Sequence, residues 1–139
     1  MVRQVLYAAL LLSLCVLIHV TGTVAMARAF KLRAAPTTGV RLFRPVLGLA
    51  AGFVLVFFLY VLEVLVWAGA YVALGATGSL EEAVYFSIMS FTTVGYGDVV
   101  LPRDWRILGA SEAAAGILIF GWSIALLIIL IERTMKELT

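Results

Sequence analysis

The segment Thr92-Thr93-Val94-Gly95-Tyr96-Gly97-Asp98 decides the fold of this 139-residue chain. Two glycines alternate in it with larger residues, and glycine adopts backbone angles that other residues avoid. In an extended segment of this kind, successive carbonyl groups can all point the same way. Such a row of dipolar oxygens can replace the hydration shell of a cation. The segment therefore indicates a backbone site for cations rather than an ordinary loop.

A short buried helix is expected directly before this segment. Ser79-Leu80-Glu81-Glu82 has the pattern of a capping box, with Ser79 as the N-cap and Glu82 at the third helical position. Residues 80–92 are apolar on nearly every side, which is typical of a buried helix. A helix of about a dozen residues measures about 18 Å, which is too short to cross a bilayer. The chain must therefore enter the membrane and return through residues 93–98, which we call the filter segment.

Three long apolar runs surround this unit, at residues 5–26, 46–74 and 107–131. Each reaches the roughly 20 residues that a membrane-spanning helix needs. The composition agrees, with 64% hydrophobic and 13% charged residues, against roughly 45–50% and 25% in soluble domains. It argues against a soluble enzyme, and the net charge of +2 is too small to indicate a nucleic-acid partner. The single cysteine, Cys15, excludes an intrachain disulfide and is expected to pack in a helix.

The charge pattern predicts how the chain crosses the bilayer. Residues 28–45 form a linker with basic residues and no acid, namely Arg28, Lys31, Arg33, Arg41 and Arg44. The positive-inside rule places this linker in the cytoplasm, which leaves the N-terminus outside and the C-terminus cytoplasmic. A signal peptide cleaved near residues 27–29 is the alternative, and it would put these basic residues outside. Trp67, Tyr71 and Trp105 lie near helix ends, where interfacial aromatic belts form.

The filter segment, with a capped short helix before it and a spanning helix after it, resembles the pore module of the potassium channel family. The likeness covers about residues 63–132 and is closest to the bacterial two-transmembrane form. Ala115-Gly116-Ile117 and Phe120-Gly121 are similar to that family's inner helix. The run at the N-terminus is an additional helix. The resemblance implies passive, potassium-selective conduction across a bacterial inner (plasma) membrane.

We therefore expect an all-α integral membrane protein with three transmembrane helices, a re-entrant pore helix and a selectivity-filter loop. The expected regions are an N-terminal transmembrane helix (1–27), a basic cytoplasmic linker (28–45), a pore domain (46–132) and a short cytoplasmic tail (133–139). Within the pore domain we expect an outer helix (46–74), a pore helix (80–92), the filter segment (93–98) and an inner helix (105–132). No enzymatic activity is expected.

By resemblance, K⁺ is coordinated by backbone carbonyls of the filter segment and by the hydroxyl of Thr93. The coordinating residues would be Thr93, Val94, Gly95 and Tyr96, with Gly97 completing the outer mouth. One chain supplies one strand and a ring of oxygens needs four, so a homotetramer in the lipid bilayer is expected. K⁺ is the permeant ion, and neither an organic cofactor nor a small-molecule substrate is expected.

Two groups are expected to support the filter segment. Asp98 either accepts a hydrogen bond from Tyr85 of the pore helix or remains a solvated carboxylate at the mouth. Glu112 is an acid inside an apolar run, and such groups usually face protein or water. It is expected to hydrogen-bond Ser87 or Ser90 behind the filter, with simple packing as the alternative.

The inner helix carries the other candidate positions. Gly116 corresponds to the family's hinge glycine, and four apolar residues follow at helical spacing along the expected cavity: Ile117, Phe120, Ile124 and Ile128. Ile124 and Ile128 are candidate gate residues, because a narrow apolar ring can close a pore by dewetting. Packing against lipid or helices is the alternative. Glu63 could join the hydrogen-bond network of Glu112 or pair with His19. His19 itself is more simply explained as a helix-packing residue, and a pH sensor is the alternative.

Two other functions stay open at this point. A non-selective cation channel would keep the fold, but the intact Val94-Gly95-Tyr96-Gly97 sequence argues against it. A non-conducting membrane subunit that regulates a partner belongs to a different class of protein. Ion flux from the purified chain alone would distinguish it from a channel.

Overall fold

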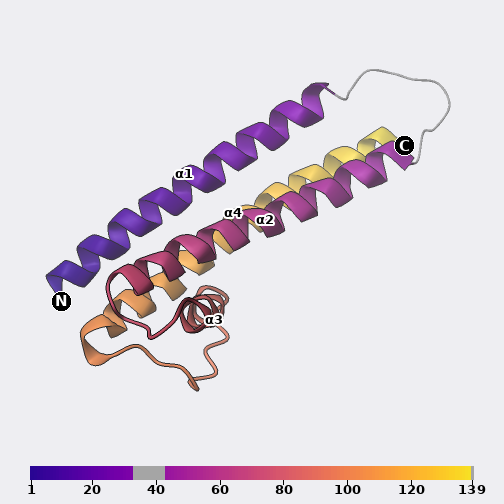
Figure 1. Cartoon of the computed structure of the whole chain (residues 1–139). Helices are drawn as coiled ribbons and strands as arrows, with labels where there is room; N and C mark the ends of the chain where they lie inside the picture. The colour runs from indigo at the N-terminus through magenta and orange to yellow at the C-terminus, as the bar shows by residue number, and fades with distance from the viewer. Residues whose placement is uncertain (33–42, 139) are drawn as a thin grey trace.

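The computed structural model describes residues 1–32 and 43–138. Over these ranges the chain folds into helices without a strand (Figure 1): α1 (Val2–Leu32), α2 (Phe43–Ala73), α3 (Leu80–Phe91), the single turn η1 (Arg103–Trp105) and α4 (Arg106–Leu138). Three segments are long and apolar enough to cross a membrane, Val2–Ala29, Pro45–Ala73 and Arg103–Lys136. The all-α class and the three spans predicted from the sequence are confirmed.

The three long helices extend beyond their predicted bounds. α1 continues to Leu32, so Arg28 lies on a helix, and α4 continues to Leu138 through the region expected to be a separate tail. The apolar runs stop where charged residues begin, but arginine, lysine and glutamate are good helix formers and the backbone continues. Of the linker predicted at 28–45, residues 33–42 lie outside the described residues.

Specific caps set the short connection between α2 and α3. Gly75, at φ 63°, ends α2: its N–H donates to the Val72 carbonyl at 3.0 Å, and the Ala76 N–H donates to the Tyr71 carbonyl at 2.8 Å. This pair of bonds is a Schellman motif. Ser79 caps α3 by accepting the Glu82 N–H at 3.1 Å. Glu82 in turn accepts the N–H of Gly78 at 2.8 Å, one position earlier than a capping box requires.

The N-terminus and α3 lie at one end of the molecule and the C-terminus lies at the other (Figure 1). α1 and α4 run in the same direction and α2 runs against both. α1 packs against α2 and also against α4. α3 fits between α2 and α4 at the end that carries the filter segment.

α1 and α4 pack in a constant register. The side chain of Gln4 contacts Leu108 and that of His19 contacts Ser123, both across 104 positions of sequence. Buried residues repeat at intervals of 11 on both helices: Gln4, Cys15 and Met26 on α1, and Leu108, Ile119 and Leu130 on α4. Eleven residues make three turns at 3.67 per turn, close to an undistorted α-helix. The two helices can therefore stay in contact along most of the bilayer.

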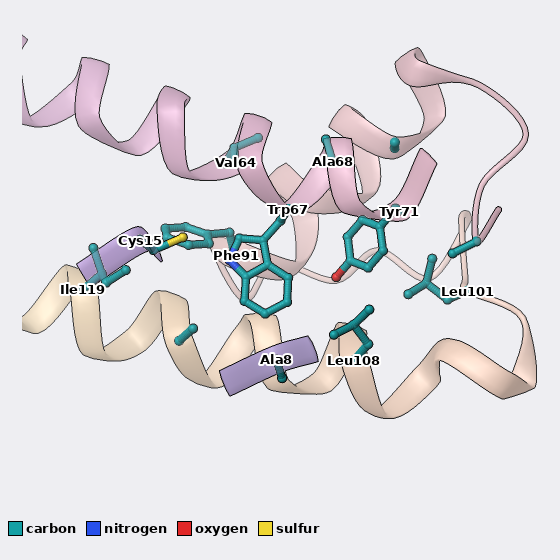
Figure 2. Packing of buried hydrophobic residues seen from close by; sticks show 13 residues of the cluster. Ala8, Cys15, Val64, Trp67, Ala68, Tyr71, Phe91, Leu101, Leu108 and Ile119 are labelled. Atoms are coloured by element: carbon teal, nitrogen blue, oxygen red, sulfur yellow. The ribbon is translucent and has the colours of Figure 1, made fainter. Parts of the chain in front are cut away.

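The core lies where α2, α3 and α4 meet. Figure 2 shows Trp67 and Tyr71 pointing from α2 toward α4, with Phe91 of α3 nearby. Trp67 and Tyr71 are 0% exposed, so their predicted place in an interfacial belt is wrong. They lie near the end of α2 in the sequence, but α3 covers that end in space. Cys15 is also buried in this cluster, as expected.

Candidate functional site

The backbone of the filter segment has left-handed angles at every second residue. Thr93, Gly95 and Gly97 have φ values of 61°, 52° and 79°. Among the described residues other than glycine, Thr93 alone has a positive φ. This conformation costs a β-branched residue energy and persists only where the surroundings hold it. The glycines predicted the angles at 95 and 97, but nothing in the residue type of Thr93 predicted the third.

The C-terminal end of α3 holds this conformation. Thr92 caps the helix, and its Oγ1 donates to the Ile88 carbonyl at 2.6 Å. The N–H of Thr93 donates to the Ser90 carbonyl at 2.9 Å, and the N–H of Gly95 donates to the Met89 carbonyl at 3.0 Å. Two donors of the filter segment are thus bonded to α3, which fixes the segment against the helix that precedes it.

The side chains of the filter segment are uncovered within one chain. Val94 is 49% exposed and Tyr96 is 75% exposed. The filter segment therefore presents an apolar and an aromatic side chain on the surface of one chain.

Asp98 is the last residue of the filter segment and is bonded to the pore helix. The Tyr85 hydroxyl donates to Asp98 Oδ2 at 2.7 Å, so the hydrogen bond expected from the sequence is present. This bond favours the carboxylate, and it lowers the pKa of Asp98 below its ordinary value. The same contact raises the pKa of the Tyr85 hydroxyl. The bond connects the end of the filter segment to the middle of α3.

Glu112 is fully buried where α2, α3 and α4 meet, and both of its carboxyl oxygens have partners. Ser87 donates a short hydrogen bond to Oε1, and the Tyr71 hydroxyl donates to Oε2 at 2.5 Å. Ser87 also contacts the Val64 carbonyl at 3.1 Å. Of the two serines considered from the sequence, Ser87 is therefore the partner. Sequence reasoning missed Tyr71, because its position near a helix end suggested the membrane interface.

Gly116 lies against the end of the pore helix. A Cβ built on it would be 2.0 Å from the carbonyl oxygen of Phe91, far inside contact distance. Gly121 on the same helix has no such neighbour within 4 Å. The absence of a side chain at Gly116 therefore lets α4 approach α3 immediately before the filter segment. Its predicted role as a hinge stays a prediction.

Three of the four residues expected to line the cavity share one exposed face of α4. Ile117, Ile124 and Ile128 are 60%, 56% and 50% exposed, opposite the face that packs on α1 and α2. Phe120 is different: its ring centroid lies 4.5 Å from that of Tyr60 and 6.1 Å from that of Phe91. Phe120 thus packs in an aromatic cluster within the subunit, and its predicted place along the cavity stays a prediction.

A second buried polar cluster joins all three long helices. His19 Nδ1 lies 2.9 Å from Glu63 Oε1, and His19 Nε2 lies 3.0 Å from the Ser123 hydroxyl. Of the two possibilities for Glu63, pairing with His19 is the one observed, and the Glu112 cluster is separate. Sequence reasoning did not identify Ser123, although its 104-position offset from His19 matches that of Leu108 from Gln4.

A comparison with known protein families shows to which family this chain belongs. Residues 59–133 match the family model described as "Ion channel", which covers more than half of the chain and extends from within α2 through most of α4. No curated protein and no solved structure matched. The matched region contains the filter segment, the two helices around it and the Glu112 cluster, whereas α1 lies before it. The chain is therefore a member of the ion channel family, an integral membrane class of proteins that are not enzymes.

Proposed function

We propose that this ion channel is a homotetramer that conducts K⁺ selectively and passively through the filter segments of four chains. The observation that carries the proposal is the alternation of left-handed angles at Thr93, Gly95 and Gly97 within a T-V-G-Y-G sequence. A backbone that alternates in this way turns successive carbonyls toward one side. Four such segments around an axis would give stacked rings of oxygens in place of the water around K⁺.

The exposure of the filter segment supports the tetramer. Within the chain Val94 is half exposed and Tyr96 is largely exposed, and a four-fold ring would give both a neighbour. Since a channel on a symmetry axis needs identical surfaces around it, one kind of chain is sufficient. The end of α3 would then face the axis, where the partial negative charge of a helix C-terminus stabilises a cation.

Two clusters would keep the ring narrow enough to select K⁺. The Tyr85–Asp98 bond holds the outer end of the filter segment, and Glu112 fixes α3 to α2 and α4 through buried hydrogen bonds. Ion selectivity depends on the number and positions of the coordinating dipoles. We therefore assign filter support to Tyr85, Asp98 and Glu112.

The exposed face of α4 would line the inner cavity. Ile124 and Ile128 from four chains would form apolar rings, and such rings can close a pore by dewetting. In the proposed orientation, the filter segment and the N-terminus lie outside, and the C-terminal end of α4 is cytoplasmic. This orientation rests on the positive-inside rule, applied to the basic residues between the first two spans. A bacterial inner membrane is the proposed location.

The test is ion flux from liposomes that contain only the full-length protein, loaded with potassium and diluted into sodium or potassium medium. We expect potassium efflux that barium blocks, with no comparable sodium flux. Equal sodium flux would contradict the proposed selectivity and favour a non-selective cation channel.

Absence of flux has two explanations that one variant separates. The double variant Ile124→Ala, Ile128→Ala removes most of the apolar ring and should open a closed gate. Flux from this variant would support a channel that is closed at rest. No flux from either protein would contradict conduction and favour a regulatory subunit.

A further inference from the structure

The His19 cluster joins three spanning helices at the depth of the proposed gate. His19 of α1, Glu63 of α2 and Ser123 of α4 are all 0% exposed. His19 uses one ring nitrogen for each partner, at 2.9 Å to Glu63 and 3.0 Å to Ser123. In the described part of the chain, the second carboxyl oxygen of Glu63 has no hydrogen-bond partner. No other polar side chain in that part therefore shares the charge of this carboxyl group through a hydrogen bond.

Beyond the one N–H that a neutral imidazole always carries, the pair of His19 and Glu63 is electrically neutral only when it holds one further proton. The proton can sit on either side chain, and the 2.9 Å contact between Nδ1 and Oε1 survives in both cases. A second proton makes the pair positive. An uncompensated charge buried among apolar helices is costly. Protonation of both groups therefore weakens the packing of α1 at this depth.

Ser123 transmits this change to the inner helix. It lies on the buried face of α4, next in sequence to Ile124 on the exposed face. A second contact between α1 and α4 is the bond from the Leu108 N–H to Gln4 Oε1 at 3.1 Å, near the outer end. The outer bond anchors the first turn of α4 and involves no titratable group, whereas the inner bond depends on His19.

We propose that His19 is a positioning residue for the gate: with one proton the His19–Glu63 pair holds α4 through Ser123, and a second proton releases it. The proposal rests on the proposed channel function and extends it. The first helix is then a working part of the channel rather than only an anchor. Because release frees the inner half of α4, acidification increases flux.

The other groups around His19 do not compete for this role. On α1, Cys15 lies one turn earlier. On α2, the ring of Tyr60 lies 6.3 Å from that of His19, and on α4 Trp122 presents its edge at 5.6 Å. Thiol and phenol groups are ordinarily neutral below about pH 8, and indole does not titrate. Glu112 of α4 lies three turns before Ser123 and bonds to Tyr71 and Ser87 rather than to His19.

The experiment measures potassium flux from liposomes between about pH 8 and about pH 4, with equal pH on both sides, a range that spans ordinary histidine and carboxyl titration. For the unmodified chain we expect at least about a fivefold increase on acidification, a typical size for coupling between sites. In His19→Gln the pair can never become positive, so flux should vary by less than about twofold. In Glu63→Gln, His19 can still gain a charge, and the increase should persist at the same or a higher pH.

Two further variants complete the test. Ser123→Ala keeps the pair but removes its link to α4, so its flux should already be high at neutral pH and should not increase on acidification. Thr21→Ala is the matched control, because its hydroxyl is exposed and bonds only to its own helix, at 2.9 Å from the Leu17 carbonyl. It should show the unmodified pH profile.

A pH profile that is flat in the unmodified chain, or unchanged in His19→Gln or Ser123→Ala, would overturn the proposal while leaving the channel function intact. Silence at every pH in the unmodified chain and also in the Ile124→Ala, Ile128→Ala variant would overturn the channel function itself, and the inference with it. Melting curves of each reconstituted variant show whether a loss of flux reflects a loss of folding.

Discussion

Gly116, which the sequence identified as an important position, has a physical role in the structure other than that of the predicted hinge. Its likeness to a hinge glycine identified it as important. In the structure its surroundings leave no space for a side chain, since a Cβ would lie 2.0 Å from the Phe91 carbonyl oxygen. That carbonyl belongs to the last residue of α3, which Thr92 alone separates from the filter segment. Gly116 therefore positions the filter segment, whether or not α4 also bends there.

Gly116→Ala should destabilise the protein by about 1–3 kcal/mol, the usual cost of forcing extra volume into a packed contact. Gly121→Ala is the matched control, because it has nothing within 4 Å of its Cβ position. Its stability should stay the same or increase by up to about 1 kcal/mol, since alanine favours a helix over glycine. Thermal melting of both variants in detergent checks this. Equal melting temperatures would show that Gly116 has no packing role.

Tyr85→Phe removes the hydrogen bond to Asp98, the largest cause of its lowered pKa, and should move that pKa upward toward its ordinary value. Because that pKa is lowered in the folded protein, the stabilisation is present at neutral pH and is lost as the pH falls through the lowered pKa. NMR titration of protein labelled at aspartate carboxyl carbons measures the change. The signal of Asp104, the second aspartate of the chain, is the internal control. An unchanged Asp98 titration would contradict the assignment.

At the scale of elements, the Glu112 cluster determines how α2, α3 and α4 fit together. The sequence identified Glu112 as a buried acid and Ser87 as a candidate partner, because charged groups in apolar helices need partners and helical spacing limits which ones are near. It did not identify Tyr71, because hydropathy shows where a helix ends but not which neighbouring helix covers that end. The angle at Thr93 was missed for a similar reason, since it follows from bonds to α3 rather than from residue type.

Glu112→Ala leaves the Tyr71 hydroxyl buried without its acceptor, which should cost about 1–3 kcal/mol for that group alone. Tyr71→Phe removes the donor instead. The double variant should be destabilised by less than the sum of the two single variants, because the partners remove the same bond. Thermal melting of the unmodified chain, the two single variants and the double variant gives the coupling free energy between Glu112 and Tyr71. Strict additivity would show that the 2.5 Å contact contributes nothing.

At the scale of the whole molecule, the sequence predicted the number of spans, the re-entrant helix and the position of the filter segment. Hydrophobic length and one capping pattern are sufficient for these features. It did not predict how α1 packs, because the buried faces of α1 and α4 include the polar residues Gln4, His19 and Ser123. Polar residues at these positions obscure the pattern until their partners are known. α1, which the sequence indicated only as an additional helix, is thus in register with α4 from Gln4 to Met26.

The native mass tests the assembly. Native mass spectrometry of the detergent-purified protein should give four times the 15.0 kDa of one chain. The exposed Tyr96 and Val94 should become protected from solvent-accessible labelling in that species. A stable monomer or dimer would contradict the four-fold arrangement, since fewer chains cannot complete a ring of filter segments.

Selectivity through the filter segment is the central claim, and the reversal potential under bi-ionic conditions tests it most directly. The purified protein is reconstituted in a planar bilayer with potassium on one side and an equal concentration of sodium on the other. The account predicts a reversal potential displaced by more than about 59 mV toward the potassium equilibrium, since each tenfold preference for a monovalent ion contributes about that amount. A current that reverses at zero would contradict it.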